Sequence, residues 1–213
     1  MGNILIPTGY GEAEHTERKS RFIGHIWHVE TEAEAIERIR ETRTKHWNAR
    51  HNVYAYLLRN GGTIRCSDDG EPSGSSGIPT LNVFQTGGIT DLVCVVTRYF
   101  GGILLGVGGL ARAYSKAAKL ALEASGISSL GLWKHLLLSC SYAQQERIRR
   151  LLSSLGGVVE NTDFGTDVLL EALLPVERLG EFERDLGELT AGTAFCEVTG
   201  ESFRATPVSP QRS

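Results

Sequence analysis

The stretch from Val93 to Tyr114, VCVVTRYFGGILLGVGGLARAY, constrains this chain more than any other segment. It opens as an apolar strand, passes an arginine and two aromatic residues, and then places five glycines within nine residues. Glycine loses more backbone entropy on folding than any other residue, so such a cluster must serve a turn or a close approach. We expect a strand, a glycine-rich turn and a helix start, an arrangement that often binds anions.

Five glycines make up this turn: Gly101, Gly102, Gly106, Gly108 and Gly109. Their backbone N–H groups could meet a phosphate, although neither the P-loop spacing nor the dinucleotide-binding spacing occurs here. The alternative is that glycine lets the turn pack closely against another backbone. The sequence leaves both interpretations open.

Hydrophobic periodicity predicts an α+β region in the first half of the chain. We expect strands at 16–29, 52–58, 63–66 and 91–96, and helices at 80–86 and 110–124. A further helix should begin after Thr31, because Thr31 and Glu34 have the spacing of a capping box. Gly126 is expected to end the helix at 110–124.

The second half predicts a smaller domain with the order βαββαβ, which is the ferredoxin-like arrangement. Its expected strands lie at 135–142, 158–164, 167–174 and 193–199, and its helices at 144–155 and 175–189. With a boundary near 128–133, the two domains are predicted to span 1–130 and 134–203. The polar, proline-containing tail at 204–213 is predicted to be disordered.

The composition is that of a globular protein with an ordinary core, since 41% of the 213 residues are hydrophobic. The formal charge of −3 argues against a strongly basic nucleic-acid binder. The four cysteines are far apart and form no CxxC pair, which predicts reduced thiols. No apolar run is long enough to cross a bilayer and no secretory signal is recognisable, so we expect a cytoplasmic protein without a membrane partner.

An acidic loop at 67–79 carries Asp68, Asp69 and Glu71 within four residues. Carboxylates are ligands for hard cations, so these residues are a candidate magnesium site. The alternative is a solvated turn, because Asp-Gly and Glu-Pro are common turn dipeptides. Magnesium is the only cofactor that the residues suggest.

Basic residues supply candidate contacts to phosphate. Arg98 precedes the glycine turn, and arginine is well suited to phosphate recognition. The alternative to phosphate binding is that Arg98 forms an ion pair with Asp68 or Asp69. Residues 38–51 hold five basic side chains around Trp47, a combination that suits RNA but also occurs on ordinary solvated helices. No catalytic constellation is recognisable, so the catalytic residues stay unknown and an enzyme is the less favoured interpretation.

Several motifs together resemble the YigZ/IMPACT family, and in particular its bacterial YigZ-like members. They are Lys19-Ser-Arg21-Phe-Ile23, Ala49-Arg-His51, Ser67-Asp-Asp-Gly-Glu-Pro72, and Thr97 through Gly106 with Leu110 through Tyr114. The resemblance implies an N-terminal domain like domain 2 of ribosomal protein S5 and a ferredoxin-like second domain, similar to the last two domains of elongation factor G. Eukaryotic members of the family act in translational control, and for this chain the resemblance implies a pair of folds suited to contact with RNA or the ribosome.

The resemblance favours a binding protein that contacts RNA or the ribosome. Its patch would comprise Arg21, Arg50, His51, Arg98 and the glycine turn. One alternative is an enzyme or binder of a small phosphorylated or nucleotide ligand, with magnesium on the acidic loop. A protein–protein adaptor is the other alternative. Whether the acidic loop and the glycine turn share a cleft depends on the tertiary structure.

Overall fold

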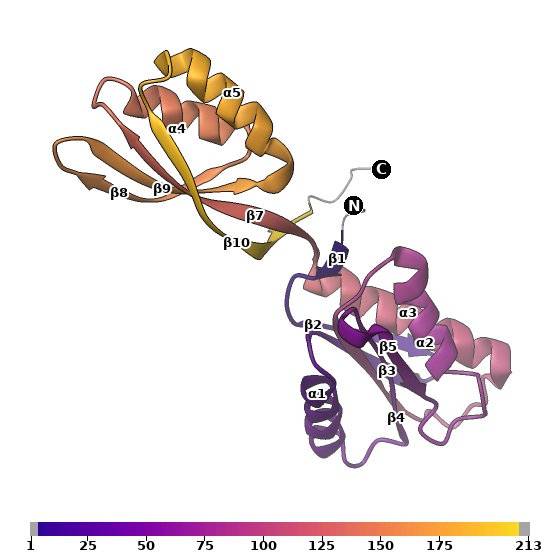
Figure 1. Ribbon diagram of the computed structural model, residues 1–213. Helices are drawn as coiled ribbons and strands as arrows, with labels where there is room; N and C mark the ends of the chain where they lie inside the picture. The colour runs from indigo at the N-terminus through magenta and orange to yellow at the C-terminus, as the bar shows by residue number, and fades with distance from the viewer. Residues whose placement is uncertain (1–3, 209–213) are drawn as a thin grey trace. The chain divides into compact units, whose positions relative to one another are not determined.

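The computed structural model describes residues 4–208, which form two compact units with an α+β organisation. Leu130–Arg204 make up the second unit, and the other described residues make up the first. Figure 1 shows a sheet and associated helices in each of them. The division assigns a separate hydrophobic core to each unit.

The first unit is built on a five-stranded sheet in the order β2-β3-β6-β4-β5. All four strand pairs are antiparallel. The strands are β2 (Gly11–Glu17), β3 (Ser20–His28), β4 (His51–Leu58), β5 (Thr63–Ser67) and β6 (Leu92–Tyr99). The central strand β6 is apolar on both faces, because Leu92 through Val96 are all buried.

Helices cover both faces of this sheet. They are α1 (Glu32–Lys45), α2 (Gly77–Gly87) and α3 (Gly106–Ser125). Side chains alternate along a strand, so Leu92, Cys94 and Val96 pack with α2 and α3. Val93 and Val95 pack on the opposite face with α1. By the same alternation, neighbouring residues at the end of β6 direct their side chains to opposite faces of the sheet.

The start of α1 confirms the predicted capping box. The Thr31 hydroxyl accepts a hydrogen bond from the backbone N–H of Glu34, and the Glu34 carboxylate accepts one from the N–H of Thr31. Two of the unpaired N–H groups at the helix start are therefore satisfied. At the other end of the unit, Gly126 follows α3, as predicted.

In the first unit, three predicted elements differ most in their boundaries. The strand expected at 16–29 is the hairpin β2–β3, because Arg18 and Lys19 adopt positive φ values of 45° and 63° and reverse the chain. The helix expected from 110 begins at Gly106, and the one expected from 80 begins at Gly77. Glycine lowers helix propensity, which hid both helix starts from the hydrophobic pattern.

The second unit has the predicted element order β-α-β-β-α-β. Its elements are β7 (Ile127–Cys140), α4 (Gln145–Ser154), β8 (Val158–Phe164), β9 (Val168–Pro175), α5 (Leu179–Thr190) and β10 (Phe195–Pro207). The strand order is β10-β7-β9-β8. The short strand β1 (Ile4–Pro7) belongs to the first unit. Leu138 and Leu170 from the strands pack with Ile148 of α4 and Phe182 of α5 in its core.

The tail prediction is wrong for residues 204–207, which belong to the long strand β10. Pairing with β7 satisfies the backbone hydrogen-bonding groups of this segment. The polar side chains of the segment did not indicate a strand. The remainder of that prediction, at 209–213, lies outside the described residues. The short strand β1 was not predicted. No helix within residues 4–208 is long and apolar enough to cross a membrane.

Candidate functional site

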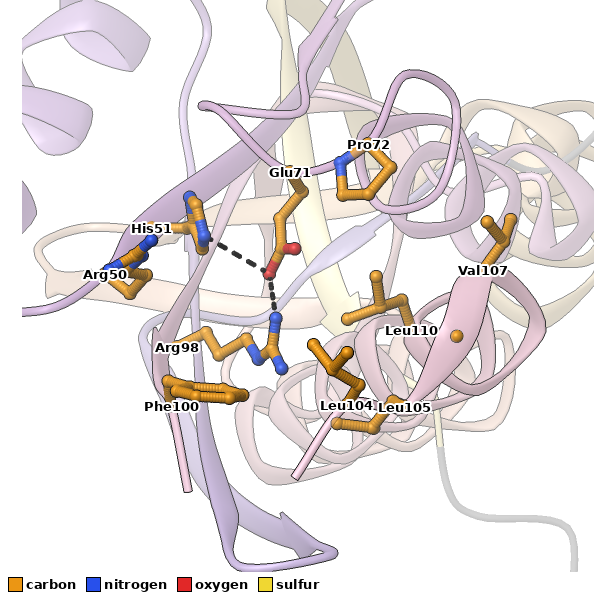
Figure 2. A pocket seen from close by; sticks show the side chains of 11 residues that line it. Arg50, His51, Glu71, Pro72, Arg98, Phe100, Leu104, Leu105, Val107 and Leu110 are labelled. Atoms are coloured by element: carbon orange, nitrogen blue, oxygen red, sulfur yellow. Dashed lines mark hydrogen bonds and ion pairs between the residues drawn. The ribbon is translucent and has the colours of Figure 1, made fainter. Parts of the chain in front are cut away.

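A pocket of about 420 Å³ lies where the acidic loop meets the glycine turn in the first unit. Its polar side is formed by Arg50, His51, Glu71 and Arg98. Its apolar lining includes Phe100, Leu104, Leu105, Val107 and Leu110. Figure 2 shows the leucines and Val107 across from the polar group, with Phe100 beside Arg98. The tertiary structure therefore brings two sequence-distant motifs, the acidic loop and the glycine turn, into one cavity.

Arg98 forms the floor of the polar side and is only 5% exposed. Its Nη1 donates to Glu71 Oε1 at 2.5 Å, and its guanidinium carbon lies 5.5 Å from the ring centres of both Phe22 and Phe100. The sequence left open a pair with Asp68 or Asp69, but the partner is Glu71. This ion pair neutralises both charges inside the protein.

Glu71 also accepts a hydrogen bond from the Tyr114 hydroxyl at 2.9 Å, so α3 is tied to the acidic loop. Burial and the adjacent Glu71 carboxylate raise the pKa of Tyr114 far above its usual value. Tyr114 therefore stays a hydrogen-bond donor. The carboxylate is held by two buried donors from different elements, β6 and α3.

His51 is oriented by the backbone of the acidic loop. Its Nδ1 lies 2.8 Å from the carbonyl oxygen of Asp69, and since a carbonyl can only accept, Nδ1 carries the proton. Nε2 then faces Glu71 Oε1 at 3.7 Å (Figure 2). This arrangement orients a His–Glu pair at the pocket, but a nucleophile that it could activate is not among the lining residues.

The other two acidic residues have separate structural roles. Asp68 accepts hydrogen bonds from the backbone N–H groups of Gly74, Ser76 and Gly77 and from the Ser76 hydroxyl, so it organises the loop before α2. Burial alone would raise the pKa of Asp68, but these hydrogen bonds outweigh burial and the net pKa is lowered. Asp69 accepts from Arg43 and from the backbone N–H of Asn52.

Each of the three carboxylates, Asp68, Asp69 and Glu71, accepts hydrogen bonds from a different set of donors. Within residues 4–208, no group of three His, Cys, Asp or Glu side chains is arranged to hold a metal ion. The magnesium site stays a prediction from the sequence, and the observed contacts give it no support.

The glycines of the turn serve different purposes. A Cβ on Gly101 would lie 2.0 Å from the carbonyl carbon of Lys19, so this glycine permits close packing on the β2–β3 turn. Gly102 and Gly106 have φ values of 85° and 69°, which favour glycine. Gly108 and Gly109 lie in the first turn of α3, whose N-cap residue, Leu105, provides no side-chain acceptor.

The predicted basic patch is divided between the two faces of the sheet. Arg21 is exposed and pairs with Glu14. Its guanidinium carbon lies 5.4 Å from the ring centre of Tyr99, on the face of the sheet opposite Arg98. Arg50 is also exposed and lines the pocket. Within residues 4–208, no acidic side chain forms an ion pair with Arg50, which makes it the one uncompensated arginine of the pocket.

Trp47 follows α1 and is 82% exposed. Several basic side chains nearby in the sequence are paired: Arg38 with Glu41, Arg40 with Glu37, Arg43 with Asp69, and Lys45 with Glu12. The segment therefore presents an aromatic surface among largely compensated charges.

Sequence reasoning missed the contributions of Ser20 and Tyr114 to this site. The Ser20 hydroxyl accepts from the backbone N–H of Gly101 at 3.1 Å and lies 3.4 Å from Arg98 Nη2. It also missed the apolar side of the pocket. A signal was present, because Leu104 and Val107 are large apolar residues inside a turn too rich in glycine to bury them.

Comparison with known proteins is consistent with this two-part organisation. The Impact N-terminal domain matches residues 18–122, and a domain of unknown function (DUF1949) matches residues 138–193. A solved structure described as a crystal structure of a hypothetical protein is similar with a TM-score of 0.59 and 32% identity. The match covers 94% of this chain and 98% of that one.

Relatives match over most of their length. The chain is 38% identical over 183 residues to the IMPACT family member YvyE of Bacillus subtilis (strain 168), covering 85% of this chain and 84% of the relative. It is 33% identical over 196 residues to the IMPACT family member YigZ of Escherichia coli (strain K12), covering 91% and 96%. This chain therefore belongs to the IMPACT family.

Proposed function

We propose that this protein contacts RNA or the ribosome and thereby modulates translation, and that it is a binding protein rather than an enzyme. The observation that carries the proposal is Trp47, a residue that is 82% exposed in a segment with five basic residues. Aromatic side chains provide stacking surfaces for unpaired bases, each contributing about 1–3 kcal/mol. The role in translation is the one that the family resemblance implies.

The proposal includes the fold of each unit. We infer that the second unit is ferredoxin-like, because its strand order β10-β7-β9-β8 places the two central strands of that topology beside each other. We infer from the family resemblance that the first unit is like domain 2 of ribosomal protein S5. Such a pair, similar to the last two domains of elongation factor G, would suit contact with ribosomal RNA.

The charge distribution supports selective rather than general binding to RNA. Surface ion pairs compensate Arg38, Arg40 and Arg43, and the whole chain has a charge of −3. Non-specific affinity for nucleic acid grows with the number of phosphates that free basic groups neutralise. We therefore expect binding to depend more on stacking by Trp47 than on total charge.

A titration of the full chain with ribosomes and with tRNA, at low and moderate salt, tests this function. Trp47→Ala should weaken binding roughly tenfold, in line with the loss of one stacking contact. Ile36→Ala removes another exposed apolar side chain of the same region and is the matched control. If the unmodified protein binds neither ligand at low salt, the proposed function is wrong. If Trp47→Ala binds as the unmodified protein does, the assigned contact is wrong.

A further inference from the structure

We infer that the pocket between the acidic loop and the glycine turn binds a small organic carboxylate with an apolar body. This inference goes beyond RNA contact and concerns a different site, since Trp47 does not line the pocket. The volume of about 420 Å³ lies within the range of about 300–1,000 Å³ of small-molecule sites.

The apolar side of the pocket is built to contact a ligand body. Leu104 is 81% exposed, Val107 is 61% exposed and Phe100 is 46% exposed, although all three are large apolar residues. They lie within eight consecutive residues and line one cavity together. Contiguous exposed apolar surface of this kind marks a binding site more often than scattered apolar residues do.

The turn that carries these side chains is fixed by contacts with the β2–β3 turn and with the acidic loop. Gly101 packs directly on the backbone of Lys19 and donates its N–H to the Ser20 hydroxyl. Tyr114, two turns into α3, is anchored on Glu71. A site with a fixed framework binds at a smaller ordering cost than a mobile loop does.

The charges of the polar side determine the charge of the ligand. Glu71 and Arg98 neutralise each other at 2.5 Å, and His51 approaches the same carboxylate oxygen. Arg50 remains without an acidic partner in the part of the chain that the structure describes. The first turn of α3 adds N–H groups that no side chain caps, and these also favour an anion.

A carboxylate matches this environment better than a phosphate does. One uncompensated arginine balances a single negative charge, whereas a phosphate monoester carries up to two charges at neutral pH. The apolar wall would also have to desolvate the additional charge, which is costly. A carboxylate attached to a hydrocarbon places its charge at Arg50 and its body against Leu104 and Val107.

Octanoate is a suitable probe, with butyrate as the short-chain control and octylamine as the charge-reversed control. Binding to the ¹⁵N-labelled full chain is followed by the amide signals of Gly102, Gly106, Gly108 and Gly109, which report on the turn directly. We expect saturable octanoate shifts confined to these amides and their neighbours at millimolar concentrations. Butyrate should bind more weakly and octylamine should cause no saturable shift.

Two substitutions test the assigned contacts. Val107→Asp places a carboxylate in the pocket at the second residue of α3 and should abolish octanoate binding. Its matched control is Ile78→Asp, which makes the same kind of change at the second residue of α2, outside the pocket. An acidic residue is favourable in the first turn of a helix, so both variants should fold. Arg50→Gln should weaken binding about tenfold, as expected for one charge-assisted hydrogen bond.

The inference is overturned if octanoate causes no saturable shift, if octylamine causes the same shifts, or if Val107→Asp binds octanoate as Ile78→Asp does. Trp47→Ala should leave octanoate binding unchanged, and Val107→Asp should leave ribosome binding unchanged. The two measurements therefore separate failure of this inference from failure of the proposed function.

Discussion

Arg98 and Glu71 form a buried ion pair across 27 residues of sequence, with 2.5 Å between Nη1 and Oε1 and both side chains more than nine-tenths buried. The pair joins the end of the central strand β6 to the acidic loop, and Tyr114 extends the connection to α3. Three segments that form the candidate pocket are thus fixed by one carboxylate.

Glu71→Gln should lower the free energy of unfolding by about 3–5 kcal/mol, because it leaves the buried Arg98 charge without a counterion. Chemical denaturation measures the loss. Glu41→Gln is the control, since it removes an exposed pair with Arg38 whose contribution should be about 1 kcal/mol or less. Equal losses in the two variants would contradict the assignment of Glu71 as a structural anchor.

Two glycines of the same turn should respond differently to alanine. Gly101→Ala should strongly lower the free energy of unfolding, because the new Cβ would overlap the backbone of Lys19 and Ser20. Gly108→Ala has space and lies in the first turn of α3, so it should be neutral or stabilising by up to about 1 kcal/mol. Thermal unfolding of both variants tests the difference, and a tolerated Gly101→Ala would contradict close packing at this position.

Stability should fall as the pH decreases from about 6.5 towards 4. Burial lowers the pKa of His25 to about 4, against the attraction of Glu12 and together with repulsion from His46 and Lys45. The unfolded chain then binds a proton that the folded chain excludes, so the stabilisation is complete above the unfolded pKa and is lost as the pH falls through the folded pKa. The loss should be on the order of 3 kcal/mol.

Denaturation at several pH values measures this dependence, and His25→Phe should flatten it. Tyr10 and Trp27 also pack against the His25 ring, so an aromatic replacement keeps the packing while it removes the titrating group. An unchanged slope in the variant would assign the pH dependence to other groups.

Magnesium should leave the melting temperature unchanged, because the oxygens of Asp68 and Asp69 already accept hydrogen bonds from protein donors. Thermal unfolding with magnesium or with a chelator tests this expectation. A rise with magnesium that Asp68→Asn abolishes would restore the cation site that the acidic sequence predicts. Asp68→Asn by itself should lower stability by about 1–2 kcal/mol through loss of the loop contacts.

The local sequence predicted those elements whose signals are local. The capping box of Thr31 and Glu34 and the apolar run of β6 depend on residues close in sequence, and both predictions are confirmed. The motifs of the first half also identified the family correctly. Helix starts at Gly77 and Gly106 were missed, because tertiary packing outweighs the low helix propensity of glycine there.

The sequence by itself determined that an acidic loop, a basic segment and a glycine turn belong to one α+β unit. Only the tertiary structure decided which carboxylate meets Arg98. Positive φ values at Asp69 (46°) and Gly70 (87°) turn the chain, so Asp69 reaches Arg43 while Glu71 reaches Arg98. The two-residue alternation of β6 then separates Arg98 from Tyr99. Composition does not predict where these side chains point, because their orientation depends on backbone geometry and on strand pairing between distant segments.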